Sequence, residues 1–184
     1  MRVIAGTCKG RTLFGPKTSS IRPALDQVKE SIFNILFNVE RATVLDLFAG
    51  TGSVGIEALS RGASSAVFVD QSEEAVRLIE KNLKICGLIE RATVFKMPVG
   101  TSIRTLSKKG GSFDLIFVDP PYLKKWVRKT LDQLAQSSLL LKTTQVVVEH
   151  HPKEPMIPPP GLELTDQRKY GQTIVSFLKK TEVG

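Results

Sequence analysis

The sequence has few cysteines and histidines and lacks any long apolar run. Its 184 residues include two cysteines and two histidines. No apolar stretch approaches the ~20 residues that a membrane-spanning helix needs. The first residues, MRVIAGTCKGRTLF, lack the apolar segment of a secretory signal. We therefore expect no membrane association and a cytoplasmic location.

The scarce cysteines and histidines also argue against metal chemistry. Cys8 and Cys86 are too far apart for a usual metal cluster, and a cytosolic pair is normally reduced. His150 and His151 are adjacent, so they point to opposite sides of a strand end, with no cysteine or second carboxylate cluster beside them. We expect no metal site, no cysteine nucleophile and no catalytic histidine.

Positive charge is in excess, with 26 lysines and arginines against 18 acidic residues and a net charge of +8. Lysine and arginine release condensed counterions from phosphates, which modestly favours a nucleic-acid partner. In residues 1–23 basic residues lie among Gly, Pro and Ser, and we interpret this segment as a basic hairpin or arm that contacts phosphates. The alternative is that these charges form a solvated surface without a partner. A second basic stretch, 124–129, is explained at least as well by a solvated helix face. The predicted phosphate contacts are Arg2, Lys9, Arg11, Lys17 and Arg22.

The length fits one domain, residues 1–184, with a single core. An amphipathic helix is predicted in 24–39, and strands and helices alternate from Thr43, as in a doubly wound α/β fold. A final antiparallel hairpin is expected at 162–180. The pattern predicts a mostly parallel seven-stranded Rossmann-like sheet with this closing hairpin and a small N-terminal β-hairpin. The parallel strands are expected at 43–48, 65–70, 92–96, 111–119 and 144–150.

A glycine loop follows the first expected strand, in TVLDLFAGTGSVG. Gly50 and Gly52 allow positive φ angles and close approach of the backbone to a ligand, and the next helix offers free N–H groups. Asp70 ends the second strand, where a carboxylate can accept both ribose hydroxyls of a nucleoside. This pattern would also suit a dinucleotide dehydrogenase.

Asp46, within the first strand, distinguishes a dinucleotide ligand from a cationic nucleoside cofactor. A buried carboxylate is costly without a partner, and it would repel a dinucleotide pyrophosphate. A cofactor with an ammonium and a sulfonium group would be attracted instead. Asp46 therefore favours S-adenosyl-L-methionine over NAD.

Asp119-Pro120-Pro121-Tyr122 follows another strand and predicts the other half of a methyl transfer. An exocyclic base amino group is a poor nucleophile because its lone pair is delocalised. Hydrogen bonds to the Asp119 carboxylate and the Pro120 carbonyl would aim that lone pair at the methyl group, and Tyr122 would stack on the base. The alternative is an ordinary surface turn.

These motifs together resemble the RsmD family of bacterial methyltransferases over nearly the whole chain. DLFAGTG and DPPY occur in many amino methyltransferases, whereas the segment beginning RPALDQV and the closing YGQT are more particular to RsmD. The segments that carry the resemblance are RVIAG, KGRTL, RPALDQVKESIFNIL, VLDLFAGTGSVGIEALSRGA, FDLIFVDPPY, VVVEH and RKYGQTIVSF.

The resemblance implies a class I methyltransferase that modifies the exocyclic N2 of a guanine in small-subunit ribosomal RNA. The substrate would be the RNA, the small subunit or an assembly intermediate, with the target base flipped or looped out, and we expect a monomer. Asp119, Pro120, Pro121 and Tyr122 would lie at the guanine. The implied cofactor contacts are Asp46, Phe48, Gly50, Gly52, Asp70, Gln71 and Met97.

One segment departs from the family pattern. Such enzymes usually carry an acidic residue after the third strand to accept the adenine amino group, but here the chain reads KMPVGTS. Met97 and Pro98 can pack on the ring without accepting that bond. We expect adenine recognition by backbone groups or apolar packing, and weaker cofactor binding.

Three other functions share these motifs. An adenine-N6 DNA methyltransferase and a protein-glutamine methyltransferase also place Asn or Asp before Pro-Pro-Tyr. The chain shows no sizeable DNA-recognition domain and no large N-terminal domain for a protein substrate. A non-catalytic RNA-binding or ribosome-assembly module is the third alternative.

Overall fold

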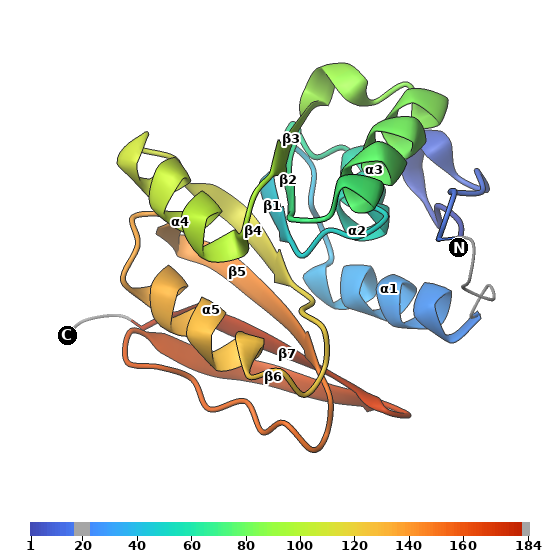
Figure 1. Ribbon diagram of the computed structural model, residues 1–184. Helices are drawn as coiled ribbons and strands as arrows, with labels where there is room; N and C mark the ends of the chain where they lie inside the picture. Colours follow the sequence, from blue (N-terminus) through green and yellow to red (C-terminus); the bar gives the residue numbers. More distant parts are fainter. Residues whose placement is uncertain (17–22, 182–184) are drawn as a thin grey trace. The chain divides into compact units, whose positions relative to one another are not determined.

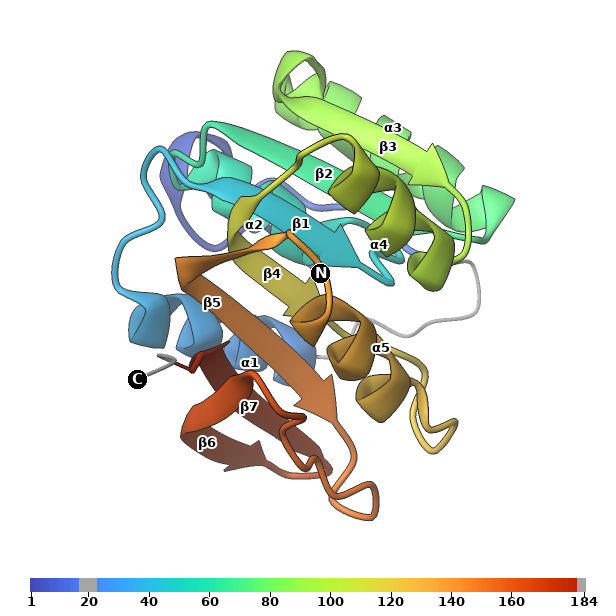
Figure 2. The ribbon, with the colours of Figure 1, turned by 90° about the vertical axis from the view of Figure 1, so that its left-hand side faces the viewer.

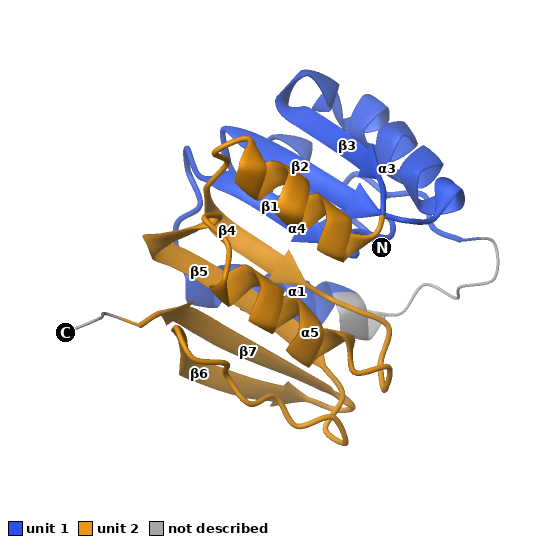
Figure 3. Cartoon of the chain, turned by 60° about the vertical axis from the view of Figure 1, so that its left-hand side comes forward, with its two compact units in different colours: residues 1–97 blue, residues 98–184 orange. Residues whose placement is uncertain are grey.

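The computed structural model describes residues 1–16 and 23–181 and divides into two compact units. Unit 1 comprises Met1–Met97 and unit 2 comprises Pro98–Gly184 (Figure 3). The predicted phosphate contacts Lys17 and Arg22 lie outside the described residues. No helix in the described part of the chain is both long and apolar enough to cross a bilayer.

Unit 1 contains three parallel strands in the order β3-β2-β1, which lie side by side in Figure 2. They are β1 (Thr43–Leu47), β2 (Ser65–Asp70) and β3 (Ala92–Lys96). β1 is buried over almost its whole length, as expected for a parallel strand covered on both faces. The predicted positions of all three strands are confirmed to within one residue.

Unit 1 contains three α-helices, and α3 has recognisable signals at both ends. The Ser72 hydroxyl caps α3 by accepting the Ala75 N–H at 3.4 Å, and Gly87 ends that helix with φ of 65°. The first helix ends three residues earlier than predicted. The elements are α1 (Pro23–Leu36), α2 (Ser53–Ser60) and α3 (Glu73–Cys86), with 3-10 turns η1 (Gly6–Cys8) and η2 (Ile89–Arg91).

The N-terminal segment folds back on itself, but its strand pairing is limited to one antiparallel bridge between Arg2 and Thr12. Within the predicted hairpin or arm, residues 1–16 pack against the rest of unit 1, because Val3, Cys8 and Leu13 are buried. A Cβ added to Gly6 would lie 1.8 Å from the carbonyl oxygen at the end of α2. This close approach leaves no room for a side chain at position 6, so glycine lets the segment lie directly against the end of α2.

Unit 2 contains four strands in the order β4-β5-β7-β6. β4 and β5 are parallel, whereas β7 pairs antiparallel with both β5 and β6, so the predicted closing hairpin is confirmed. Helices α4 and α5 lie next to each other (Figure 1). The elements are α4 (Val99–Lys108), β4 (Phe113–Val118), α5 (Trp126–Ala135), β5 (Leu140–His150), β6 (Leu162–Tyr170) and β7 (Thr173–Lys180).

β5 begins at Leu140, four residues earlier than predicted, and α5 ends at Ala135. The Ser137 hydroxyl donates to the Leu134 carbonyl and accepts the Leu139 N–H, so a side chain satisfies the groups that would continue the helix. Buried Thr144 then donates to the Phe113 carbonyl oxygen at 2.6 Å. These short polar side chains set the boundary between helix and strand.

Candidate functional site

The glycine loop between β1 and α2 has the predicted backbone conformation. Gly50 has φ of 56°, and Gly52, the N-cap of α2, has φ of 75°. The Gly52 N–H donates to the Ala49 carbonyl at 2.7 Å, and the Ala49 N–H donates to Val69 on β2 at 3.0 Å. The loop is therefore a tight turn fastened to the neighbouring strand, with its backbone presented at the carboxyl ends of β1 and β2.

Asp70 fastens the same loop through its side chain. One carboxylate oxygen accepts the Gly50 N–H at 2.9 Å and the other accepts the Ser72 N–H at 2.8 Å. Each oxygen keeps acceptor capacity, since a carboxylate has about four lone-pair sites. Asp70 is half-exposed. It can therefore hold the loop and still accept a hydroxyl from a ligand.

Asp46 is buried, with 3% of its surface exposed, and it accepts the Gly55 N–H at 3.0 Å in the first turn of α2. That position favours a negative charge. A Cβ on Gly55 would lie 2.3 Å from the Phe68 ring, so only glycine permits this packing of helix on strand. Gly55 was not among the predicted site residues, although its place as the third glycine of the loop was a signal for this role.

The other three predicted cofactor residues belong to the connections that follow these strands. Phe48 is half-buried and has a positive φ of 62°, which is unusual outside glycine and often marks a functional loop. Gln71 is exposed and Met97 is half-buried. The Met97 N–H donates to the Asp70 carbonyl at 3.0 Å. Because that amide is engaged, the thioether side chain is what Met97 can offer to an adenine ring.

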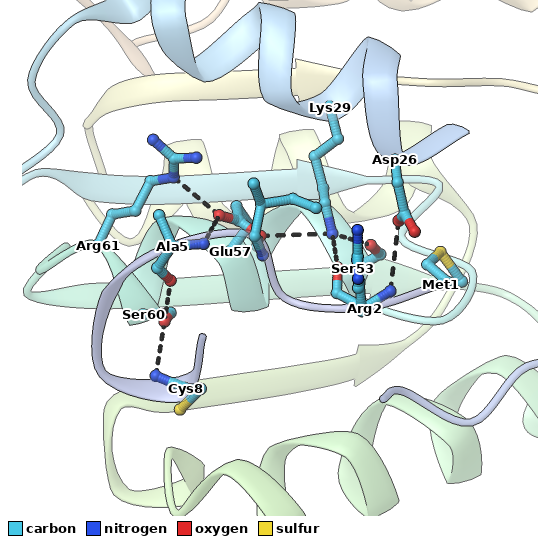
Figure 4. Close-up of polar contacts among 12 residues, drawn as sticks. Met1, Arg2, Ala5, Cys8, Asp26, Lys29, Ser53, Glu57, Ser60 and Arg61 are labelled. Atoms are coloured by element: carbon cyan, nitrogen blue, oxygen red, sulfur yellow. Dashed lines mark hydrogen bonds and ion pairs between the residues drawn. The ribbon is translucent and has the colours of Figure 1, made fainter. Parts of the chain in front are cut away.

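A buried carboxylate anchors the N-terminal segment to α2. Glu57 is completely buried, and its two oxygens accept the N–H groups of Ile4 at 2.8 Å and Ala5 at 3.0 Å (Figure 4). Arg61 also donates to it at 2.8 Å. Residues 4 and 5 are therefore bound through backbone donors to a charge in the middle of a helix.

Lys29 of α1 completes this network. Its ammonium group is 3.4 Å from the Glu57 carboxylate, and it donates to the Arg2 carbonyl at 2.7 Å and the Ser53 hydroxyl at 3.0 Å (Figure 4). Burial lowers the pKa of Lys29, and the Glu57 carboxylate opposes that shift. Ser53 is the first residue of α2, so the network reaches the end of the glycine loop.

Asn82 of α3 makes a second link between the N-terminal segment and the glycine loop. Its fully buried amide accepts the Phe14 N–H at 2.8 Å and donates to the carbonyls of Phe14 at 3.0 Å and Thr51 at 2.9 Å. Arg2, Lys9 and Arg11 are exposed and thus belong to a segment that is linked to the glycine loop at both ends. Lys29, Glu57 and Asn82 were missed, although a polar residue in an apolar helical stripe is the signal that marks them.

In unit 2, Asp119 directly follows β4. Asp119 is partly open to solvent, and desolvation of its carboxyl group raises the pKa of Asp119 to about 6. Pro120 is buried and Pro121 is exposed. This part of the chain is thus a fixed turn with an acceptor side chain at its tip.

Tyr122 is held from two directions. Its hydroxyl is hydrogen-bonded to the Thr173 hydroxyl at 2.9 Å, and its ring lies 5.7 Å from the His151 ring at a tilt of 56°. Burial raises the pKa of Tyr122, and the charges of Asp119 and Glu149 raise it further. Tyr122 is 38% exposed, so part of the residue is open to a ligand.

The two histidines have different surroundings. His150 is buried between the Glu154 carbonyl, 3.0 Å from Nδ1, and the Ser176 hydroxyl, 2.9 Å from Nε2, and burial lowers its pKa. Its role is structural. His151, by contrast, packs against Tyr122, a contact that the sequence did not predict.

These features define a class of protein. A glycine loop with carboxylates on two parallel strands, and Asp-Pro-Pro-Tyr after a further strand, are typical of methyltransferases with a Rossmann-like α/β fold. The Escherichia coli protein yhhF, whose solved structure is described provisionally as a methyltransferase, supports this class. It matches with a TM-score of 0.84 and 27% identity, covering 98% of this chain and 97% of that chain.

The family follows from the sequence comparisons. A family model described as "Conserved hypothetical protein 95" matches residues 1–179. Ribosomal RNA small subunit methyltransferase D of Haemophilus influenzae is 32% identical over 96% of this chain and 91% of its own length. YlbH of Bacillus subtilis, named provisionally as an rRNA methyltransferase, is 39% identical over 98% of this chain and 99% of its own. The chain belongs to this family, the RsmD family of small-subunit ribosomal RNA methyltransferases.

Proposed function

We propose that this protein transfers a methyl group from S-adenosyl-L-methionine to the exocyclic N2 amino group of a guanine in small-subunit ribosomal RNA. The observation that carries the proposal is the ordered Asp119 to Tyr122 turn after β4, which offers acceptors and a partly open aromatic ring. The relatives named as small-subunit ribosomal RNA methyltransferases support the choice of substrate. We also propose that the protein acts as a monomer in the cytoplasm.

The residues of unit 1 fit the cofactor. When bound, S-adenosyl-L-methionine supplies a methyl group already activated by a sulfonium. Asp70 has free acceptor capacity for ribose hydroxyls, and the backbone at Gly50 has open space around its Cα. Asp46 places a negative charge beneath the loop, which suits a cationic ligand better than a pyrophosphate. Phe48, Gly52, Gln71 and Met97 would complete the pocket, with Met97 packing on the adenine.

The residues of unit 2 would orient the target base. The Asp119 carboxylate and the Pro120 carbonyl would accept the two N–H groups of the amino nitrogen and direct its lone pair at the methyl group. Tyr122, held by Thr173 and His151, would stack on the guanine. A strong general base is unnecessary, because the proton leaves after the nitrogen has become cationic. Asp119 therefore acts by orientation and electrostatic stabilisation.

The positive charges of the N-terminal segment would contact RNA phosphates. Arg2, Lys9 and Arg11 are exposed on a loop that is bound to the glycine loop, and Lys17 and Arg22 belong to the same basic segment. Phosphate contacts position a nucleic acid without reading its sequence.

Asp70→Ala should weaken cofactor binding by about tenfold or more, because it removes acceptors for the ribose and for the Gly50 and Ser72 amides. Calorimetric titration with S-adenosyl-L-methionine measures the effect, and Glu163→Ala, at an exposed site on β6, is the control. An unchanged dissociation constant for Asp70→Ala would mean that the ribose is held elsewhere.

Methyl transfer should depend on a group with a pKa of about 6. Asp119 must be ionised to accept the amino N–H, so kcat/KM for RNA should fall about tenfold per pH unit below pH 6 and level off above it. Asp119→Asn should abolish this slope, since an amide does not titrate. A wild-type kcat/KM that is the same at pH 5 as at pH 7 would contradict an essential carboxylate.

The substrate class is tested by incubating the protein with radiolabelled S-adenosyl-L-methionine and four acceptors in parallel. These are undermethylated small ribosomal subunits, free ribosomal RNA, DNA and release-factor protein. The proposal expects label in ribosomal RNA, free or assembled. Label in DNA or protein alone would favour the alternative amino methyltransferases, and RNA binding without transfer would favour an assembly module.

A further inference from the structure

Unit 2 carries a cavity of about 630 Å³ immediately after the Asp119 to Tyr122 turn. Its walls come from the connection that starts at Leu123, the outer face of α5, and residues 153–157 before β6. The apolar part of the lining is Leu123, Val127, Pro155, Met156 and Ile157. Ile157 is 64% exposed, so a large apolar side chain is left open to solvent at this place. The volume lies within the range of small-ligand sites.

Positive charge surrounds this apolar cavity. Four cations line it against two carboxylates, Asp132 and Glu154. Both carboxylates are engaged: Asp132 accepts from Arg128 at 2.9 Å, and Glu154 accepts the Leu123 N–H at 2.9 Å. The remaining positive charge favours an anionic ligand with an apolar body. The cations are Lys125, Arg128, Lys129 and Lys153.

The cavity and the target turn share one piece of backbone. Leu123 follows Tyr122 directly, has a positive φ of 61°, and is fixed by its hydrogen bond to Glu154. The other oxygen of Glu154 is buried and accepts no hydrogen bond from the residues that the structure describes. A base N–H that reached this oxygen would satisfy it. The cavity therefore begins at the residue that follows Tyr122.

We infer that this cavity binds a second nucleotide of the RNA substrate, next to the target base. The inference rests on the proposed function for its substrate class. An unpaired base enters the apolar part, while Lys125 and Lys153 contact the phosphates on either side of it. Two unpaired nucleotides would then be required, so the site predicts a preference for a loop or bulge over a single flipped base in a duplex.

Nucleotide binding to the cavity is measurable without any methyl transfer. Trp126 is the only tryptophan, and it lies between the cavity residues Lys125 and Val127, with the Lys129 ammonium 4.9 Å above its ring. Titration with cytidine 5′-monophosphate, which lacks the proposed target base, should change its fluorescence. Ile157→Glu should raise the dissociation constant about tenfold by placing a polar anion in the cavity. Leu164→Glu, the same change at an exposed site on β6, should leave it unaltered.

Steady-state kinetics give the second readout. Ile157→Glu and Lys153→Ala should raise KM for RNA, by about tenfold and about threefold, and leave affinity for S-adenosyl-L-methionine unchanged. Leu164→Glu and Lys142→Ala are the matched controls. If the wild-type protein methylates RNA and Ile157→Glu behaves like Leu164→Glu in both assays, the second-nucleotide site is wrong and the proposed function stands. If no RNA is methylated, the proposed function fails, and an absence of cytidine 5′-monophosphate binding overturns the site independently.

Discussion

Replacing Asp119 with alanine should lower the rate of methyl transfer by about a hundredfold or more while leaving cofactor affinity nearly unchanged. The reason is that its carboxylate acts on the developing charge of the amino nitrogen, and removal of one such preorganised group typically costs about 10²–10³ in kcat. All cofactor residues that we propose lie in unit 1, whereas Asp119 follows β4 in unit 2. Single-turnover kinetics with saturating RNA and cofactor give the rate, and calorimetry gives the affinity.

A matched control variant distinguishes a local effect of Asp119→Ala on the rate from a general loss of structure. Glu163→Ala removes an exposed carboxylate from β6 of the same unit and should retain wild-type rate and affinity. Equal losses of rate and cofactor affinity in Asp119→Ala would refute the orienting role. A rate within threefold of wild type would show that the amino group is held by other residues.

The Glu57→Leu variant should lose about 3–5 kcal/mol of unfolding free energy, which is typical when one partner of a buried ion pair is removed. Lys29 would remain buried without its carboxylate, and the Ile4 and Ala5 N–H groups would lose their acceptor. Urea denaturation followed by circular dichroism measures the loss.

The double variant Lys29→Met/Glu57→Leu tests the cause. Removing both charges should restore part of the lost stability, because no uncompensated cation stays buried. Recovery should be incomplete, since the two N–H groups remain without Glu57. A double variant less stable than Glu57→Leu, or a loss below about 1 kcal/mol for Glu57→Leu, would show that the pair does not hold the N-terminal segment in place.

The strands and the glycine loop were predictable because their signals are local. The apolar run 43–47 ends at a loop whose glycines need positive φ angles, and Ser72 and Gly87 mark the two ends of α3. Each signal depends on residues within one or two turns of the chain. The fold class followed from the order of such segments.

The polar network of unit 1 was not predictable in the same way. Glu57 finds its partners at Ile4, Ala5 and Lys29, and the last of these is 28 positions away. A buried charge indicates that a partner exists, but the sequence does not say which one. For the same reason, the packing of residues 1–16 against α2 and α3 was not predicted from the sequence.

The residues that surround the Asp119 to Tyr122 turn could not be predicted from local sequence patterns either. The turn itself follows from a strand that is succeeded by Asp119 and two prolines. Its supports are Thr173 of β7 and two residues of the connection after β5, His151 and Glu154. Their positions depend on the pairing of β5 with β7, which brings distant segments together.

The most direct test of the whole account is to identify the modified nucleoside. Undermethylated small subunits are treated with the protein and S-adenosyl-L-methionine carrying a deuterated methyl group, and the RNA is digested and analysed by mass spectrometry. The account predicts deuterium in N2-methylguanosine for the wild-type protein and almost none for Asp119→Ala. Deuterium in N6-methyladenosine, or in no nucleoside despite RNA binding, would contradict it.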